Sequence, residues 1–357
     1  MYYLFGILMF VLIMMLSLVF YKYIYRICEF FNLKINKIIL CVISIVLFYG
    51  SLVIGMMNKY VSVVLIFILY LILSYMVVLI LNKFLFKYER YKKVYLFIPI
   101  IVSLVSVIYG IYNIYDVRMK SYDVSNNDKL SNNYKAVLIT DLHYGLAIKG
   151  EGLQKKINEI NELNPDMVFL VGDIVDESTT LDEMKECFHV LGSLKTTYGI
   201  FYSYGNHDEN IYSREKNYSK KTLAEVIHSN GINILEDETY RINDELTIIG
   251  RSNGYKTSIS DLVSNVNSDD YKVVLAHIPE DYKSLKDNNI DLVLSGHTHA
   301  GQIFPAKLIE ELFKMSDMIY GYEVDGTFNK VVTSGIAGWG IPIRTDEHSE
   351  YVVLNIK

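Results

Sequence analysis

Four long apolar runs in the first third of the chain constrain its fold most, because none of them contains a charged residue. They are Tyr3–Phe20, Ile38–Met57, Val61–Leu81 and Val94–Ile114. Each is close to the roughly 20 residues that a helix needs to cross the hydrocarbon core of a bilayer. Buried core helices of a soluble protein are a poor alternative, since such runs would leave residues 1–114 almost without polar surface. We therefore predict an all-α transmembrane anchor with four helices over residues 1–114.

Basic residues are concentrated in two of the three loops between these runs. The first of these loops holds Lys22, Arg26, Lys34 and Lys37, and the third holds Lys83, Lys87, Arg90, Lys92 and Lys93. The second loop holds only Lys59. Because cytoplasmic loops carry an excess of Lys and Arg, we predict a multi-pass protein of the cell membrane. Its N-terminus and everything after Ile114 are then extracytoplasmic, although Arg118 and Lys120 oppose this orientation.

After the fourth run, the composition changes to that of a soluble α/β domain. Residues 115–134 form a polar linker with a possible edge strand near Met119–Val124, and residues 135–357 alternate short apolar strands with amphipathic helices. This alternation predicts two packed sheets with helices outside. The net charge of −6 gives no support for nucleic-acid binding. The predicted helices are Gly152–Leu163, Leu181–Leu194 and Lys221–Ser229, and the predicted strands are Ala136–Thr140, Met167–Val171, Ile200–Tyr204, Ile232–Leu235, Thr239–Ile242, Leu246–Gly250, Tyr271–Ala276, Asp291–Ser295, Val331–Ser334 and Tyr351–Ile356.

Five of the apolar strands are followed at once by Asp, His or Asn. The clearest case is LVLSGHTHAGQ at Leu292–Gln302; the others are LITDLHYG at Leu138–Gly145, VFLVGDIVD at Val168–Asp176, FYSYGNHD at Phe201–Asp208 and VVLAHIP at Val273–Pro279. A lone HxH or GNHD is weak, because either is also found at surfaces and in capped turns. Ligands of open α/β sheets lie beyond the carboxyl ends of the strands. The five strand ends are therefore predicted to converge on one site.

The residues at these ends are typical ligands of divalent metal ions. They are Asp141, His143, Asp173, Asn206, His207, Asp208, His277, His297 and His299. Carboxylate, imidazole and amide donors without Cys suit Mn, Fe or Zn in a reactive site better than a structural zinc knot. There are enough donors for two ions, and Asp173, after Gly172, is the candidate for a bridging ligand. Two such ions can hold a hydroxide between them and bind the oxygens of a phosphoryl group. His189, His228 and His348 are interpreted as structural or exposed.

The ordered set DxH, GDxxD, GNHD, a lone His and GHxH resembles the calcineurin-like metallophosphoesterases, over about residues 135–357. The GHTHxGQ ending is similar to the membrane-attached bacterial branch, with Ala300 in place of a glycine. The resemblance implies a four-layer α/β/β/α sandwich with one metal held by Asp141, His143, Asp173 and His299, and another by Asp173, Asn206, His277 and His297. It also implies that His207 contacts the phosphate and assists the leaving group, that Asp208 orients the His207 imidazole, and that Asp176 holds a ligand in place.

Arg344 ends a G-x-G…P-x-R stretch that fits this branch only loosely. It would bind a second phosphate or a head group, or else form a surface ion pair.

The segment Phe304–Tyr322 interrupts the domain and contains an amphipathic turn or two over Lys307–Met315. This helix either packs on the sheet or forms a lid or interfacial patch that accepts lipid chains.

The function predicted from these features is hydrolysis of phosphate ester or pyrophosphate bonds by a metal-bridging hydroxide, with lipid or lipid-linked molecules at the membrane among the candidate substrates. Two alternatives remain: a phosphoesterase for soluble nucleotides or phosphorylated wall components, and a non-catalytic membrane sensor on the same scaffold. A sensor would be expected to have lost ligands, but every expected ligand is present.

Overall fold

The computed structural model describes residues 2–55, 57–85, 94–213 and 215–357. The chain divides into two units, which are described separately. The helical unit comprises Met1–Tyr112 with Gly340–Ile343, and the sheet unit comprises Asn113–Trp339 with Arg344–Lys357. The side chains Lys87, Arg90, Lys92 and Lys93 of the predicted third loop lie outside the described residues.

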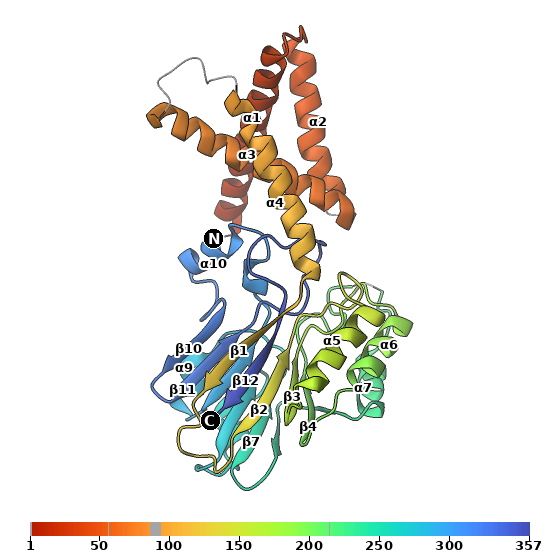
Figure 1. Cartoon of the computed structure of the whole chain (residues 1–357), viewed down its shortest axis with the longest axis vertical. Helices are drawn as coiled ribbons and strands as arrows, with labels where there is room; N and C mark the ends of the chain where they lie inside the picture. The colour runs from red at the N-terminus through yellow and green to blue at the C-terminus, as the bar shows by residue number, and fades with distance from the viewer. Residues whose placement is uncertain (1, 56, 86–93, 214) are drawn as a thin grey trace. The chain divides into compact units, whose positions relative to one another are not determined.

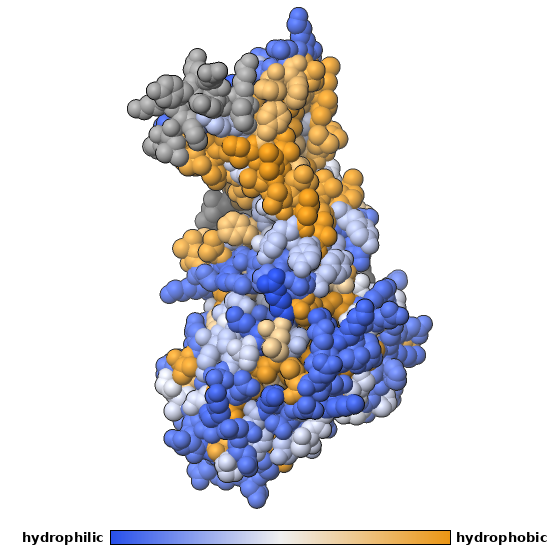
Figure 2. All heavy atoms as spheres, in the orientation of Figure 1, coloured by the Kyte–Doolittle hydropathy of each residue, from blue (hydrophilic) through white to orange (hydrophobic). Residues whose placement is uncertain are grey.

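The described part of the helical unit consists mainly of long apolar helices (Figure 1). Four helices are long and apolar enough to cross a membrane, which confirms the predicted set; in Figure 2 their surface is largely hydrophobic. Phe20, Phe48 and Ile72 form part of their shared core, and the Tyr23 hydroxyl donates to the carbonyl of Leu96 (2.7 Å). The elements are α1 (Tyr2–Phe30), α2 (Lys37–Gly55), α3 (Lys59–Leu85), a 3-10 turn (Val94–Leu96) and α4 (Ile98–Tyr115).

Three of these helices differ clearly in extent from the predicted runs. α3 continues past Leu81 to Leu85, so that Lys83 of the predicted third loop lies in the helix. α1 continues past Phe20 to Phe30, because the intervening residues include neither Gly nor Pro, and this extension carries Lys22, Arg26 and Glu29. α4 begins at Ile98 instead of Val94, since Pro99 is favoured in the first turn of a helix and disfavoured further in.

The described residues of the sheet unit form two six-stranded mixed sheets. The first sheet has the order β1 (Arg118–Val124), β12 (Glu350–Ile356), β2 (Tyr134–Ile139), β3 (Met167–Val171), β4 (Gly199–Ser203) and β5 (Ile232–Ile234). The second has the order β10 (Gly321–Asp325), β11 (Phe328–Val332), β9 (Leu292–Ser295), β8 (Tyr271–Leu275), β7 (Leu246–Gly250) and β6 (Glu238–Arg241). In the first sheet, β2 to β5 are parallel and β12 is antiparallel to β2. In the second, β7, β8, β9 and β11 are parallel and the edge strands β6 and β10 are antiparallel.

Alternating side chains place each strand between two apolar layers. Along β2, Ala136 and Leu138 point into the core between the sheets, while Val137 and Ile139 pack beneath α5 (Glu151–Glu162), α6 (Leu181–Leu191) and α7 (Lys220–Ser229). These three helices cover the outer face of the first sheet in Figure 1. The outer face of the second sheet packs against α8 (Ile259–Val263) and α9 (Tyr282–Asp287). The predicted four-layer α/β/β/α architecture is thereby confirmed.

The largest departures from the predicted elements lie near the C-terminal end of the chain. The predicted strand Val331–Ser334 is β11, which pairs with an unpredicted β10 through a tight turn at Gly326 (φ 70°). α10 (Ala306–Phe313) forms where an amphipathic turn was predicted, but none of its residues, all of them described, is buried. The alternative that this helix packs its apolar side on the sheet is therefore wrong.

Candidate metal centre

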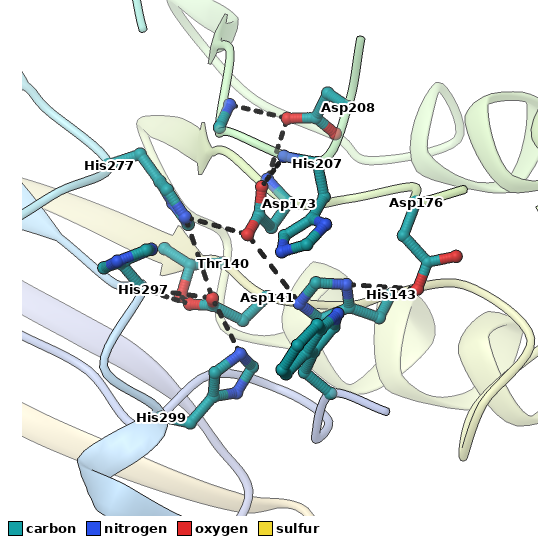
Figure 3. A network of polar contacts seen from close by, with 12 residues as sticks. Thr140, Asp141, His143, Asp173, Asp176, His207, Asp208, His277, His297 and His299 are labelled. Atoms are coloured by element: carbon teal, nitrogen blue, oxygen red, sulfur yellow. Dashed lines mark hydrogen bonds and ion pairs between the residues drawn. The ribbon is translucent and has the colours of Figure 1, made fainter. Parts of the chain in front are cut away.

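The candidate ligands converge at the carboxyl ends of five strands, as predicted (Figure 3). Asp141 and His143 follow β2, Asp173 follows β3 and Asn206 follows β4 in the first sheet, whereas His277 follows β8 and His297 and His299 follow β9 in the second. Their donor atoms form two groups, in each of which all atoms lie within 4.8 Å of one another. One group is Asp141, His143 and His299, and the other is Asp173, His277 and His297.

Asp173 connects the two groups. Its Oδ2 lies 3.0 Å from His277 Nε2 and 3.8 Å from His143 Nε2, so one carboxylate oxygen faces an imidazole of each group. Its other oxygen accepts the backbone N–H of His207 (2.8 Å), which fixes the carboxylate plane. This geometry is what a ligand shared by two ions requires.

Several donor atoms of the centre lack the hydrogen bonds that buried polar atoms normally make. His143 Nε2, Asn206 Oδ1 and His277 Nε2 are buried without a hydrogen-bond partner among the described residues. A buried polar atom without a partner is costly, and a metal ion satisfies a nitrogen or amide oxygen of this kind. The residues present therefore fit two divalent ions.

Two of the imidazoles are oriented by groups behind them. His277 Nδ1 lies 2.9 Å from the carbonyl of Val171, which leaves Nε2 facing Asp173. His143 Nδ1 lies 3.2 Å from Asp176 Oδ2. Such contacts fix the ring orientation and the tautomer of metal-binding histidines. Asp176 thus occupies the supporting position that the resemblance implied.

The backbone of the centre is unusual for residues other than glycine. Asp141, His143, Asp173, His297 and His299 have φ between 39° and 69°. The left-handed region is unfavourable for residues with a Cβ, and it persists only where the surroundings hold it in place. Ala300, the residue that replaces a glycine of the related motif, also has a positive φ (48°). Left-handed backbone therefore occurs at five of the seven candidate metal ligands.

Two glycines allow the strand ends to approach closely. A Cβ on Gly205 would lie 2.2 Å from Asp173 Oδ1, and one on Gly296 would lie 2.2 Å from Asp141 Oδ2. The Asp141 carboxylate also accepts the backbone N–H of His297 (3.1 Å to each oxygen). The motif glycines are thus required because a carboxylate occupies the space of their missing side chains.

The electrostatics of the centre favour a positive charge between the two groups. Burial alone would lower the pKa of His277, but the carboxylates of Asp173 and Asp141 outweigh it and raise that pKa to about 10. Burial opposes ionisation of Asp173, yet the charge of His277 outweighs burial and holds the pKa of Asp173 well below its usual range. Burial, reinforced by the charge of His277, lowers the pKa of His297 to about 4. The lowered pKa values of Asp173 and His297 favour an ionised carboxylate and a neutral imidazole, the forms that bind metal ions, whereas a bound ion would take the place of the proton on His277.

His207 lies beside the two groups, but its partner differs from the prediction. Its Nδ1 lies 2.8 Å from Glu177 Oε2, a residue that sequence reasoning missed. Burial would lower the pKa of His207, but the contact with Glu177 outweighs it and raises that pKa. The rings of Tyr212 and Trp339 lie 5.0 and 5.1 Å from the imidazole. The DxxDE spacing after β3 was the available signal for Glu177.

The prediction that Asp208 orients the His207 imidazole is wrong. The carboxylate of Asp208 is buried and accepts four backbone N–H groups, from Asp173, Ile174, Val175 and Gly205, at 2.6–3.1 Å. It therefore holds the loop after β3 against the loop after β4.

Both predicted roles of Arg344 are also wrong. Its side chain is fully buried and donates to the carbonyls of His299, Ser334 and Ala337 at 2.6–2.9 Å. Burial lowers the pKa of Arg344 to about 10. Without exposure it can form neither a surface ion pair nor a head-group contact, and it fixes the carbonyl of a candidate ligand instead.

Comparisons with known proteins agree with this site. Residues 134–301 match the family of calcineurin-like phosphoesterases. An uncharacterized metallophosphoesterase of Helicobacter pylori is 35% identical over 237 residues, which are 64% of this chain and 61% of that protein. A transmembrane protein with metallophosphoesterase domain from Danio rerio is 30% identical over 244 residues, which are 63% of this chain and 54% of that protein. The crystal structure of a dimetal phosphatase from Danio rerio is similar at 10% identity with a TM-score of 0.40, over 62% of this chain and 92% of that one.

The chain carries a calcineurin-like metallophosphoesterase domain, preceded by four helices that are long and apolar enough to span a membrane. The family predicted from the five motifs is thus confirmed. This chain spans less than two thirds of the length of the two relatives named above.

Proposed function

We propose that this protein is a membrane-anchored di-metal phosphoesterase that hydrolyses phosphate ester or pyrophosphate bonds. The observation that supports it most is the pair of His/Asp groups with Asp173 between them. In this proposal one ion is held by Asp141, His143, Asp173 and His299. The other is held by Asp173, Asn206, His277 and His297, and the donor set suits Mn, Fe or Zn.

Two bound divalent ions would supply charge for the phosphoryl oxygens and lower the pKa of an attacking water. The protein's own residues position the substrate and protonate the leaving oxygen. The shared carboxylate of Asp173 sets the separation of the two sites, and Asp208 fixes the loop that carries it. His207, whose raised pKa favours the protonated form, contacts the phosphate and donates a proton to the leaving oxygen. Glu177 holds the imidazole for that transfer.

The proposed location is the cell membrane, with the sheet unit on the extracytoplasmic side, as the distribution of basic residues indicates. An introduced cysteine at exposed Ser268 tests this orientation. In intact cells, a membrane-impermeant maleimide should label Ser268→Cys to the same extent as in lysed cells. Labelling that requires lysis would place the domain in the cytoplasm.

Hydrolysis is tested with the full chain in detergent, purified without chelator and assayed with Mn²⁺ on bis-p-nitrophenyl phosphate and p-nitrophenyl phosphate. We expect metal-dependent hydrolysis that falls in His207→Ala because the phosphate contact is lost. On an alkyl phenyl phosphate, whose poor leaving group needs a proton, the fall should reach about 10²–10⁴-fold, the range typical of a lost general acid. His189→Ala is the matched control, because His189 is exposed on α6, outside both His/Asp groups. If the wild-type chain binds two ions but hydrolyses no phosphate or pyrophosphate ester, the sensor alternative replaces the enzyme.

A further inference from the structure

α10 presents its apolar side to the outside, the reverse of an ordinary surface helix. Leu308, Ile309, Leu312 and Phe313 fall within about 140° of the helix circumference at 100° per residue, and all are exposed; Leu312 and Phe313 are 76% and 71% accessible. Figure 2 shows apolar side chains gathered at the surface over α10. A helix of a globular protein normally turns such a face to the core. An exposed face of this kind indicates an apolar partner.

The polar side of α10 faces the sheet unit. Lys307 Nζ lies 2.6 Å from Glu347 Oε1 and 4.9 Å from the centre of the Tyr320 ring. Just before the helix, the backbone N–H of Phe304 donates to Thr345 Oγ1 (3.0 Å). The inward polar contacts hold the helix with its apolar side outward, so this arrangement is built into the fold.

Residues 344–349 contact both α10 with its preceding residues and the last residues of α4, and these contacts lie within the sheet unit. Asn113 Nδ2 donates to the carbonyls of Arg344, Asp346 and Glu347 at 3.2–3.3 Å, and Ser349 Oγ donates to the carbonyl of Ile114 (3.0 Å). α4 ends at Tyr115 and is one of the candidate membrane spans. Residues 344–349 therefore connect α10 to the last residues of that helix.

A cavity of about 340 Å³ joins α10 to the candidate metal centre. His297 and His299 line it on the side of the metal groups, Glu310 and Met315 line it on the side of α10, and Trp339 also lines it. A molecule whose phosphate reaches the histidines thus extends from them toward the helix.

We propose that the apolar face of α10 rests in the interface of a lipid bilayer, and that the adjoining cavity takes the phosphate of an amphiphile from that bilayer. The first part depends only on the helix and its attachment. The second part rests on the proposed phosphoesterase function and names its substrate class: phosphate esters or pyrophosphates that carry an acyl or polyprenyl-like chain. The face of α10 then receives the chain while the phosphate lies at the metal centre.

Bilayer contact is tested by fluorescence quenching with the full chain in nanodiscs of phosphatidylcholine with brominated acyl chains. In a Trp339→Phe background, which removes the single native tryptophan, Phe313→Trp reports on α10. Tyr240→Trp is the matched control, because Tyr240 is an exposed aromatic on β6, at the other edge of the second sheet from β10. We expect brominated lipid to quench the emission of Phe313→Trp at least twofold relative to unbrominated lipid and to leave Tyr240→Trp unchanged.

Equal, weak quenching of both reporters would overturn the bilayer contact. Protection of Phe313→Trp from aqueous iodide without quenching by brominated lipid, varying with protein concentration, would overturn it in favour of contact with a second copy of the chain.

The substrate class is tested with two diesters that differ only in chain length, p-nitrophenyl hexadecyl phosphate in nanodiscs and p-nitrophenyl methyl phosphate in solution. We expect a kcat/KM at least tenfold higher for the hexadecyl ester. In Leu312→Gln/Phe313→Gln this advantage should fall to about onefold while the methyl ester is hydrolysed as before. Hydrolysis of both esters at equal rates by the wild-type chain would overturn the amphiphile, and so would hydrolysis of p-nitrophenyl phosphate but of neither diester. Hydrolysis of none of the three would overturn the phosphoesterase and leave the quenching result to decide the bilayer contact.

Discussion

Two carboxylates lie beside the metal groups, those of Asp208 and Glu177, and they make different contacts. The GNHD motif suggests that Asp208 orients the His207 imidazole, but in the structure Glu177 makes that contact. Asp208 binds backbone N–H groups and Glu177 contacts the His207 imidazole. The difference follows from geometry, because the Asp208 side chain points beneath the loop after β3 while Glu177 lies on the same side as the ring. At the scale of single residues, we expect the first contact to serve stability and the second to serve the proposed proton transfer.

Replacing Asp208 by Ala should destabilise the sheet unit by about 2–5 kcal/mol, because it leaves four buried N–H groups without their acceptor. Thermal unfolding followed by the tertiary circular dichroism signal measures this. Asp182→Ala is the control, since the Asp182 side chain is fully exposed at the start of α6. An Asp208→Ala protein with unchanged stability would show that this network is not structural.

Replacing Glu177 by Gln should lower the rate most for substrates with poor leaving groups. The contact with Glu177 favours the protonated imidazole, and proton donation matters little when the leaving group is already as stable as p-nitrophenolate. We expect about a tenfold fall for an alkyl phenyl phosphate and less than threefold for bis-p-nitrophenyl phosphate, measured as kcat. Glu209→Gln, whose carboxylate pairs with Lys220 instead, should change neither rate. Equal losses on both substrates would argue against a role in protonating the leaving group.

At the scale of elements, the sequence predicts the strands and the residues at their ends better than it predicts long-range side-chain contacts or the orientation of a helix. Each apolar run and the polar residue after it lie within a few positions, so a local pattern is sufficient for Asp141, Asp173 and His277. Glu177 contacts His207, 30 positions away, and Arg344 contacts His299, 45 positions away, and no local pattern reports such contacts. The outward face of α10 could not be predicted either, because periodicity shows that a helix is amphipathic but not which side meets the protein.

The loop after β9 depends on the absence of a side chain at Gly296. Gly296→Ala would push a methyl group against Asp141, which a Cβ would approach to 2.2 Å. We expect this substitution to remove at least one bound ion per chain, as measured by elemental analysis. Gly152→Ala is the control, because a Cβ on Gly152, in α5, meets only Ile148 at 3.8 Å. Full metal content in Gly296→Ala would mean that the loop can move without loss of the centre.

At the scale of the whole molecule, each metal group takes residues from both sheets. Asp141, His143 and Asp173 come from the first sheet, and His277, His297 and His299 come from the second. Any ion bound there joins the two halves of the sandwich. Metal binding and the stability of the sheet unit are therefore coupled.

Removal of metal should lower the unfolding temperature of the sheet unit. An ion present at 100 times its dissociation constant stabilises the folded state by about 2.7 kcal/mol per site. Differential scanning calorimetry of the full chain in detergent, with and without chelator, measures the shift, and added Mn²⁺ should reverse it. If chelator leaves the unfolding temperature unchanged in a chain that binds metal, the ions do not connect the sheets.

The central claim is that Asp173 joins two metal sites into one centre, and the most direct test is to count the ions. The full chain and Asp173→Ala are each equilibrated with Mn²⁺ or Zn²⁺, separated from free metal and subjected to elemental analysis. We predict two ions per wild-type chain, at most one in Asp173→Ala, and loss of metal-dependent hydrolysis in the variant. Two ions in the variant would contradict the shared ligand, and no ion in the wild-type chain would contradict the metal centre itself.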